Sequence, residues 1–178
     1  MQINAKQIPY VNLQEQWLEE RDDLLPIMDK VFANAQFVGG EELDKFEENI
    51  AKVCGTKYAC ALNSGTDALM LALVMSGVRK GDEVITPPNS FIASTAAIVH
   101  IGAIPVFVDV EEETLCLDIE LVRDAITDKT KAIMLVSANG RYPKSGIRAF
   151  EELCKEKNII LIEDSAQSLG SFYPNGRH

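Results

Sequence analysis

The stretch Ile159 to Gly170, which reads Ile-Ile-Leu-Ile-Glu-Asp-Ser-Ala-Gln-Ser-Leu-Gly, decides the fold of this chain. Its four consecutive branched apolar residues form a run that is too short for an ordinary helix, and Asn158 and Gly170 bound it. The pattern predicts a buried strand over residues 159–162 that leads into a turn. Asp164 then lies just past the strand, at the edge where open α/β sheets bind their ligands.

Two polar residues after this strand are candidate ligand contacts. Gln167 follows Asp164 by three residues, so a short helix after the strand would direct both side chains at one small polar ring. Alternatively, Asp164 only caps that helix by accepting hydrogen bonds from its first amides. The stretch by itself leaves both interpretations open.

Upstream of this stretch, segments typical of strands and of helices alternate. We expect strands over residues 58–62, 83–86, 104–108 and 132–136. We expect helices over residues 66–76, 90–101, 119–126 and 147–157, with Asp118 as the N-cap of the third. Such alternation is typical of βαβ units, so the sequence predicts a three-layer α/β/α fold in which helices cover both faces of a mostly parallel sheet.

The N-terminal part of the chain is expected to be helical. A helical pattern covers residues 14–33, and we expect Pro26 to interrupt or restart it, because proline suits the first turn of a helix better than its interior. A second helix is expected over residues 41–53. Because no linker or low-complexity tract divides the sequence, we expect a single domain over residues 1–178.

Composition excludes several classes of function. A chain of 178 residues with 47% hydrophobic content can bury a sizeable core. Its net charge of -10 and its lack of any Lys and Arg cluster argue against a nucleic-acid or anionic membrane partner. We find neither a signal-peptide pattern nor a run of membrane-spanning length, so we expect a cytoplasmic protein.

The cysteines and histidines of the sequence limit which metal sites and catalytic triads it can form. The four cysteines form no Cys-x-x-Cys pair and are expected to be reduced, small hydrophobic residues. With only His100 and His178 present, we expect no His-rich metal site and no Ser-His-Asp triad, and His100 is expected at a helix end. The acidic run Glu111-Glu112-Glu113 is expected to be a solvated turn.

The segment from Asn63 to Ala68 is a candidate phosphate site. Free amides at a helix N-terminus can bind phosphate, with Gly65 allowing close approach and the Thr66 hydroxyl alongside. Asp67 places a negative charge in the same turn, which suits the helix dipole but repels a phosphate unless the carboxylate points away. The segment could also be only a good helix start. It is neither a P-loop nor a Gly-x-Gly-x-x-Gly dinucleotide loop.

Phe91 follows the next expected strand, after Pro87 and Pro88. At the same sheet edge as Thr66 and Asp164, its ring could stack on a flat heterocycle; alternatively, it is a core residue that begins the next helix. A phosphorylated aromatic nitrogen heterocycle would use the phosphate cradle, the ring and the acid together. Pyridoxal phosphate is the cofactor whose chemistry requires this set, because an acid beside the pyridine nitrogen keeps it protonated.

Several segments, in this order, resemble the N-terminal part of the DegT/DnrJ/EryC1/StrS family of sugar aminotransferases, within fold type I of the pyridoxal-phosphate enzymes. Each segment alone is weak evidence for the family, but the set of segments together is highly specific for it. They are Phe37-Val38-Gly39-Gly40 with Phe46-Glu47, Ser64-Gly65-Thr66-Asp67-Ala68-Leu69, Phe91-Ile92-Ala93-Ser94, Gly102-Ala103-Ile104-Pro105-Val106-Phe107-Val108-Asp109 and Glu163-Asp164-Ser165-Ala166-Gln167.

The resemblance implies a role for each candidate residue. Gly65 and Thr66 would hold the phosphate of pyridoxal 5'-phosphate, Phe91 would stack on its ring, Asp164 would bond the pyridine nitrogen, and Gln167 would reach the ring's oxygen side. The family transfers an amino group, usually from glutamate, to a keto group on a nucleotide-linked sugar, in amino-sugar and lipopolysaccharide biosynthesis. The resemblance also implies a homodimer with active sites at the subunit interface.

The sequence departs from the family pattern at two places. Ser137-Ala138-Asn139-Gly140 stands where the family often has a His-Leu-Tyr-Gly type of motif, on the substrate side of the site. The family's Schiff-base lysine lies past His178; no lysine of this sequence occupies its place, and Lys144 is expected at the surface. We therefore expect a truncated member that lacks the C-terminal small domain, contains no catalytic residue and is inactive alone.

Three alternatives remain open at this point. The first is a related dehydratase of nucleotide-linked sugars, in which histidine replaces the Schiff-base lysine. The second is a non-catalytic cofactor-binding or assembly protein. The third is a different α/β enzyme whose ligand is a nucleotide. A truncated family member would also leave a sheet edge uncovered, which favours self-association.

Overall fold

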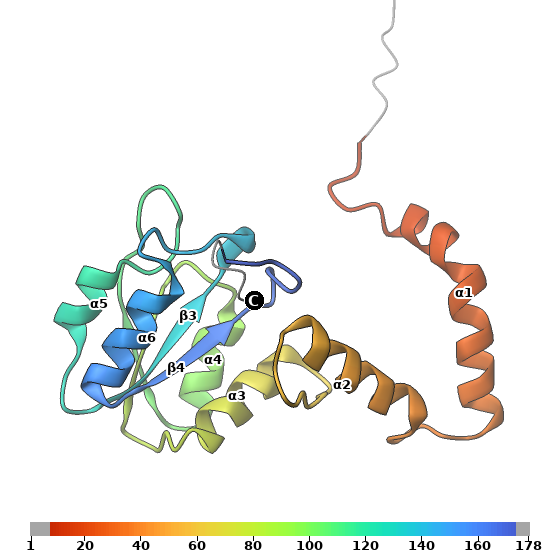
Figure 1. Cartoon of the computed structure of the whole chain (residues 1–178), viewed down its shortest axis with the longest axis horizontal. Helices are drawn as coiled ribbons and strands as arrows, with labels where there is room; N and C mark the ends of the chain where they lie inside the picture. Colours follow the sequence, from red (N-terminus) through yellow and green to blue (C-terminus); the bar gives the residue numbers. More distant parts are fainter. Residues whose placement is uncertain (1–7, 174–178) are drawn as a thin grey trace, which may run out of the picture. The chain divides into compact units, whose positions relative to one another are not determined.

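The computed structural model describes residues 8–173, which fall into two compact units divided between Phe46 and Glu47. The smaller unit contains α1 (Leu13–Ala33) and the start of α2 (Glu41–Val53) (Figure 1). Both predicted helices are confirmed. Within residues 8–173, no helix combines the length and the apolar character needed to cross a bilayer.

The predicted interruption at Pro26 is wrong, because α1 continues through this residue. A proline inside a helix removes one backbone hydrogen bond, which leaves the bonds of the other turns in place. Both ends of α1 are also closed: Asn12 Oδ1 accepts from the Glu15 amide at 3.3 Å, and the Asn34 amide donates to the Lys30 carbonyl at 3.1 Å.

The larger unit contains a four-stranded parallel sheet in the order β2-β1-β3-β4. Its strands are β1 (Glu83–Thr86), β2 (Ile104–Phe107), β3 (Thr130–Val136) and β4 (Ile160–Asp164). These four predicted strands are confirmed, but β4 is an edge strand in which Ile162 alone is buried, so the prediction that this strand is buried is wrong. Asp164 is the last residue of β4 and pairs with Val136 of β3, instead of following the strand as predicted.

The helices of the larger unit match the predicted helices to within two residues at each end. They are α3 (Gly65–Met75), α4 (Ile92–His100), α5 (Ile119–Ala125) and α6 (Gly146–Lys157), with a short 3-10 helix, η1 (Ala138–Gly140), after β3. Asp118 caps α5, since its Oδ1 accepts from the Glu120 amide at 2.8 Å. His100 ends α4, where a cation suits the helix dipole.

Helices cover both faces of the sheet, as predicted (Figure 1). Alternate residues of a strand point to opposite faces, and on β3 Ala132 and Met134 pack on one face with α3 and α4. Ile133 and Leu135 pack on the other face with α5 and α6. Because β3 is buried on both faces, its apolar residues run consecutively, as is typical of parallel sheets.

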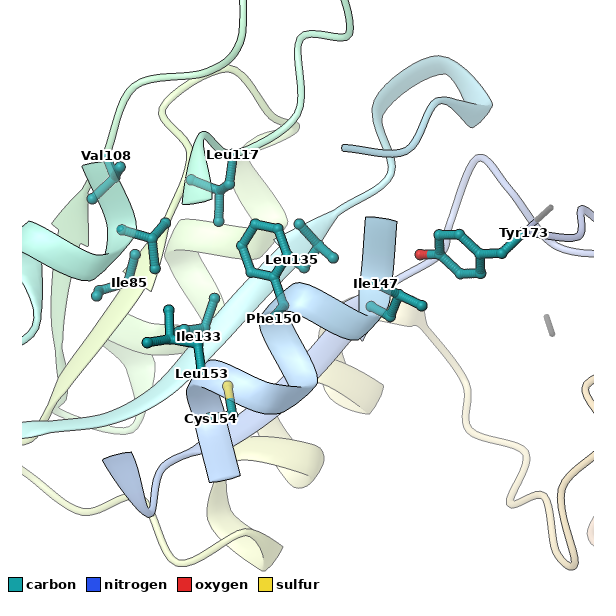
Figure 2. Close-up of a cluster of buried hydrophobic side chains, with 11 residues drawn as sticks. Ile85, Val108, Leu117, Ile133, Leu135, Ile147, Phe150, Leu153, Cys154 and Tyr173 are labelled. Atoms are coloured by element: carbon teal, nitrogen blue, oxygen red, sulfur yellow. The ribbon is translucent and has the colours of Figure 1, made fainter. Parts of the chain in front are cut away.

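Phe150 is at the centre of the second of these cores, between α6 and the sheet. Figure 2 shows its ring, together with Leu153 of α6, directed at Ile133 and Leu135 of β3. The Phe150 side chain is fully buried. This packing fixes α6 on the face of the sheet opposite α4.

The strand predicted over residues 58–62 is wrong. Tyr58 is exposed rather than half-buried, so the alternating pattern does not correspond to a sheet face. The Ala61 amide donates to the Glu47 carboxylate at 2.8 Å instead of to a neighbouring strand. Residues 58–62 therefore form no strand.

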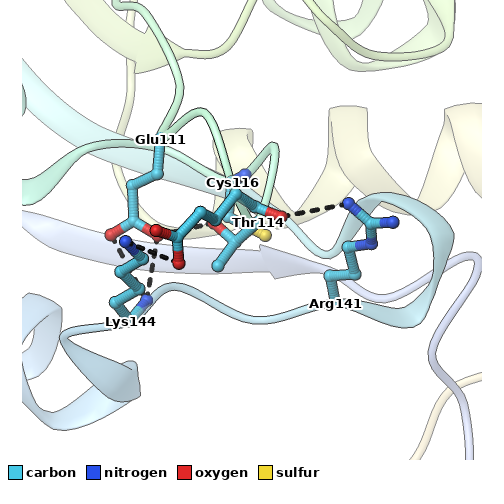
Figure 3. A network of polar contacts seen from close by, with 6 residues as sticks. Glu111, Thr114, Cys116, Arg141 and Lys144 are labelled. Atoms are coloured by element: carbon cyan, nitrogen blue, oxygen red, sulfur yellow. Dashed lines mark hydrogen bonds and ion pairs between the residues drawn. The ribbon is translucent and has the colours of Figure 1, made fainter.

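The acidic run at residues 111–113 is more than the solvated turn that we expected. Figure 3 shows Glu111 accepting hydrogen bonds from the Lys144 amide, at 3.0 Å to Oε2, and from the Thr114 hydroxyl. Lys144 Nζ pairs with Glu113 Oε2 at 2.7 Å, and the Arg141 guanidinium donates to the Glu113 carbonyl at 3.2 Å. These contacts join the loop after β2 to the loop after β3. Lys144 itself is exposed, as predicted.

The four cysteines are free thiols in different environments. Cys116 and Cys154 are buried, as expected of small hydrophobic residues, Cys54 is half-buried, and Cys60 is exposed, contrary to that expectation. Burial, followed by the charge of Glu151, raises the pKa of the Cys154 thiol from 9.0 to about 11. Burial likewise raises the pKa of Cys116.

These buried thiols predict a loss of stability at alkaline pH. Between pH 9 and 11 the unfolded chain loses the Cys154 proton while the folded chain retains it, so the free energy of unfolding falls as pH rises. From Cys154 alone we expect a fall of about 1 kcal/mol between pH 8 and 10, measured by urea unfolding. Cys154→Ala should reduce this fall, whereas Cys60→Ala should retain it. An equal fall in all three chains would contradict the prediction.

Candidate functional site

Asp164 is held by two hydrogen bonds at the carboxyl end of β4. Ser94 Oγ, in the first turn of α4, donates to Asp164 Oδ2 at 2.8 Å. The Ala166 amide donates to Oδ1 at 3.3 Å, which forms a turn after the strand. The residues that follow form turns rather than a helix, so Asp164 is not a helix cap and the alternative interpretation is wrong.

The prediction that Gln167 shares a helical face with Asp164 is wrong, because residues 165–173, the described residues after β4, form no helix. Gln167 Oε1 instead accepts from the Asn139 amide at 2.8 Å. Asn139 lies in η1 in a left-handed conformation, with φ of 55°. The Ser137 amide donates to the Asp164 carbonyl at 3.2 Å, so the segment that departs from the family pattern is bonded to both residues of the motif.

The N-terminus of α3 begins with a reciprocal cap. Ser64 Oγ accepts from the Asp67 amide at 3.1 Å and donates to the Asp67 carboxylate at 3.0 Å. In the described part of the chain, the amides of Gly65 and Thr66 have no protein acceptor. The space beside the Gly65 Cα is open, since an added Cβ would meet no atom within 4 Å. Two free amides and an open approach are features of an anion site.

Phe91 is the N-cap residue of α4 and is 78% exposed. The alternative that it is a core residue is therefore wrong. Its carbonyl accepts from the Ser94 amide at 3.2 Å, so the exposed ring and the serine that binds Asp164 belong to one helical turn. The structure thus brings Phe91 and Asp164 to the same end of the sheet, on the face that α4 covers.

The remaining candidates reach this region through helix packing. α3, which begins at Gly65 and Thr66, packs against both α4 and β4. Among the described residues, no hydrogen bond joins Thr66 to Asp164. The structure therefore brings together the elements that carry the predicted phosphate site and the acid, without a direct link between the two side chains.

The arrangement fits a phosphorylated heterocycle at this edge of the sheet. Asp164 offers an oriented carboxylate, the first turn of α4 offers an exposed ring, and α3 offers free amides beside an open approach. At the end of β1, the Thr86 hydroxyl is buried without a hydrogen-bond partner in the described part of the chain. By strand alternation it lies on the same face as Asp164, and a buried hydroxyl of this kind requires a water or ligand partner.

A cavity of about 710 Å³ lies beside this region, where β3 and β4 end. Glu163, Ser165 and Tyr173 line it, and Asp164 does not. The Tyr173 hydroxyl donates to Glu163 Oε1 at 2.6 Å, and burial, followed by this bond to Glu163, raises the pKa of Tyr173. This cavity therefore does not contain the oriented carboxylate of Asp164.

The sequence-based predictions missed two contributors to the site, Ser94 and Asn139. Ser94 does have a sequence signal: it is a polar residue in an apolar helix, one turn after Phe91, in a segment that resembles the family. Asn139 has only a weak signal, because asparagine tolerates the left-handed conformation but occurs in many other turns.

These features define an α/β protein with a candidate ligand site at the carboxyl edge of a parallel sheet. The chain belongs to the DegT/DnrJ/EryC1/StrS aminotransferase family, whose sequence model matches residues 19–178. The fold and the resemblance predicted from the sequence are both confirmed.

Three relatives illustrate the similarity. The UDP-2-acetamido-2-deoxy-3-oxo-D-glucuronate aminotransferase of Pseudomonas aeruginosa is 35% identical over 170 residues, which are 96% of this chain and 47% of that protein. The crystal structure of DesV from S. venezuelae superposes with a TM-score of 0.93 at 35% identity and covers 98% of this chain and 46% of that one. The E. coli GDP-4-keto-6-deoxy-D-mannose-3-dehydratase with bound hydrated PLP has a TM-score of 0.76 at 31% identity, covering 84% and 40%.

The chain spans about half the length of the curated relatives that it matches, between 45% and 47% of the first two. The similarity is therefore nearly complete over this chain and partial over the relatives.

Proposed function

We propose that this chain is the part of an aminotransferase of nucleotide-linked keto sugars that binds pyridoxal 5'-phosphate, with glutamate as the amino donor. The observation that carries the proposal is the carboxylate of Asp164, which ends β4 and is oriented by Ser94 from the helical turn that begins at the exposed ring of Phe91. Membership of the family supports the cofactor and the reaction class.

Each candidate residue has one role in this proposal. The amides of Gly65 and Thr66, with the Thr66 hydroxyl, hold the phosphate; Phe91 stacks on the ring. Asp164 holds a proton on the pyridine nitrogen, and Gln167 lies toward the ring's oxygen side. The cofactor supplies an electron sink when the ring nitrogen is protonated. No residue of this sequence is proposed as the Schiff-base lysine.

A titration with pyridoxal 5'-phosphate tests the proposal. The wild-type chain should change the visible absorption of the cofactor saturably, and Thr66→Val should weaken binding roughly tenfold, because a hydrogen bond to a charged group contributes about 1.5–3 kcal/mol. Thr127→Val is the matched control, since Thr127 lies in the loop before β3, at the opposite end of that strand. No saturable change with the wild-type chain would overturn the proposal.

A nucleotide-sugar dehydratase is the second candidate. It is supported by the similarity to the E. coli dehydratase that was solved with bound hydrated PLP. The aminotransferase is favoured because the matching family is described by that activity, as is the Pseudomonas aeruginosa relative. Both candidates use the same cofactor site, so the titration tests what they share.

We further propose a homodimer in the cytoplasm that serves amino-sugar and lipopolysaccharide biosynthesis. No residue of α1 is buried in the described chain, although the helix carries Trp17, Leu24 and Phe32, and such apolar surface favours association. Four free cysteines fit a reducing compartment. The role in amino-sugar biosynthesis is supported by the Pseudomonas aeruginosa relative, which is named as an aminotransferase of a UDP-linked keto sugar.

A further inference from the structure

We propose that Ser94 is a positioning residue that orients the Asp164 carboxylate toward the ring nitrogen of the cofactor, with Ser90 as its support. The inference deepens the proposed function and rests on it. The two serines and the acid form one hydrogen-bonded chain: Ser90 Oγ and Ser94 Oγ are 2.8 Å apart, and Ser94 Oγ lies 2.8 Å from Asp164 Oδ2. The hydrogen bond between Ser94 and Asp164 joins residues that are 70 positions apart in the sequence.

The number of protons available determines which group donates in each of these hydrogen bonds. A hydroxyl has one proton to donate, and an ionised carboxylate can only accept. The Ser94 proton is therefore used on Asp164, and Ser90 must donate its own proton to the Ser94 oxygen. Ser94 thus accepts a hydrogen bond from Ser90 while it donates one to Asp164.

Burial makes this arrangement specific. Ser94 is 1% exposed, so its hydroxyl has no access to bulk water and depends on its protein partners. A serine inside a helix usually bonds a carbonyl one turn back or points to solvent. Ser94 bonds a carboxylate of β4 instead, from a helix face whose other buried residues, Ala97 and Ile98, are apolar.

The two bonds to Asp164 act on different oxygens. Oδ2 accepts from Ser94 at 2.8 Å, and Oδ1 accepts from the Ala166 amide at the longer distance of 3.3 Å. The terminal torsion of aspartate is broad, so a carboxylate held at one oxygen can rotate. Without Ser94, only the longer bond would remain, and the lone pair available to a ring N–H would lose its direction.

A matched pair of variants tests the role of the hydroxyl. Thr and Val have nearly the same shape, so Ser94→Thr and Ser94→Val add similar bulk and differ in whether a donor to Asp164 is present. In the titration with pyridoxal 5'-phosphate, Ser94→Val should raise the dissociation constant at least tenfold and reduce the induced circular dichroism of the bound cofactor. Ser94→Thr should stay within about threefold of wild type, and Ser90→Ala should lie between them.

A double variant distinguishes positioning from a structural effect. If Ser94 acts through Asp164, Ser94→Val should weaken binding little further in an Asp164→Asn background. Equal binding by Ser94→Thr and Ser94→Val, with wild-type binding intact, would overturn the positioning role and leave the proposed function standing. A full additional loss in the Asp164→Asn background would also overturn it. A wild-type chain that binds no cofactor would instead refute the proposed function itself.

Discussion

Asp164→Ala is expected to bind pyridoxal 5'-phosphate roughly a hundredfold more weakly than the wild-type chain. Opposite unit charges in contact near a protein surface attract each other by about 4 kcal/mol, and a loss of about 3 kcal/mol after screening by solvent corresponds to a hundredfold change. The substitution also removes the acceptor of Ser94, whose buried hydroxyl then has no charged partner. Both effects act in the same direction. The dissociation constant is measured by the visible absorption of the cofactor.

Two further variants isolate the charge of Asp164. Asp164→Asn keeps the size of the side chain and an oxygen that can accept from Ser94, so it should weaken binding mainly through the lost charge. Asp124→Ala makes the same change in net charge on α5, which covers the opposite face of the sheet, and should bind as wild type does. If Asp124→Ala weakens binding as much as Asp164→Ala does, the effect comes from net charge rather than from a contact at the ring.

The fold could be predicted largely from the sequence because each element of the sheet has a local signal. The consecutive apolar residues of β3 indicate a strand buried on both faces, and Asp118 marks the start of α5 through its own side chain. The predictions failed where a residue distant in the sequence determines the local structure. Residues 58–62 have the apolar content of a strand, but the Glu47 carboxylate accepts the amide of Ala61.

The candidate site was predictable in its chemistry but not in its connections. Asp164, Phe91 and Thr66 each follow from their place after a strand or at a helix start. The bond between Ser94 and Asp164 depends on where the first turn of α4 lies relative to the end of β4, which no local pattern contains. For Gln167 the local pattern was misleading. Helical spacing predicted that its side chain shares a face with Asp164, but its Oε1 accepts from the Asn139 amide in the loop after β3.

Phe150→Ala is expected to lower the free energy of unfolding by about 3–5 kcal/mol. The Phe150 ring is fully buried between α6 and the sheet (Figure 2), and truncating such a ring loses its transfer free energy and leaves a cavity. Domains are typically stable by about 5–15 kcal/mol, so the loss would be a large share of the total. Urea unfolding followed by far-ultraviolet circular dichroism measures it.

Phe107→Ala provides the same chemical change at a 53% exposed position on the edge strand β2, and it should cost about 1 kcal/mol or less. Where Phe150→Ala does not fold, Phe150→Leu should still cost more than Phe107→Ala. Equal costs at the two positions would contradict the assigned core.

The Phe150 variants also separate stability from binding. Glu163 and Leu161 of β4 lie on the face that carries Phe150, so Asp164, by strand alternation, lies on the other face with Ser94. A chain that has lost core packing on the α6 face should therefore bind the cofactor with wild-type affinity wherever it remains folded. Asp164→Asn should show the opposite pattern, with weak binding and a nearly unchanged unfolding midpoint, because its amide oxygen can still accept from the buried Ser94 hydroxyl.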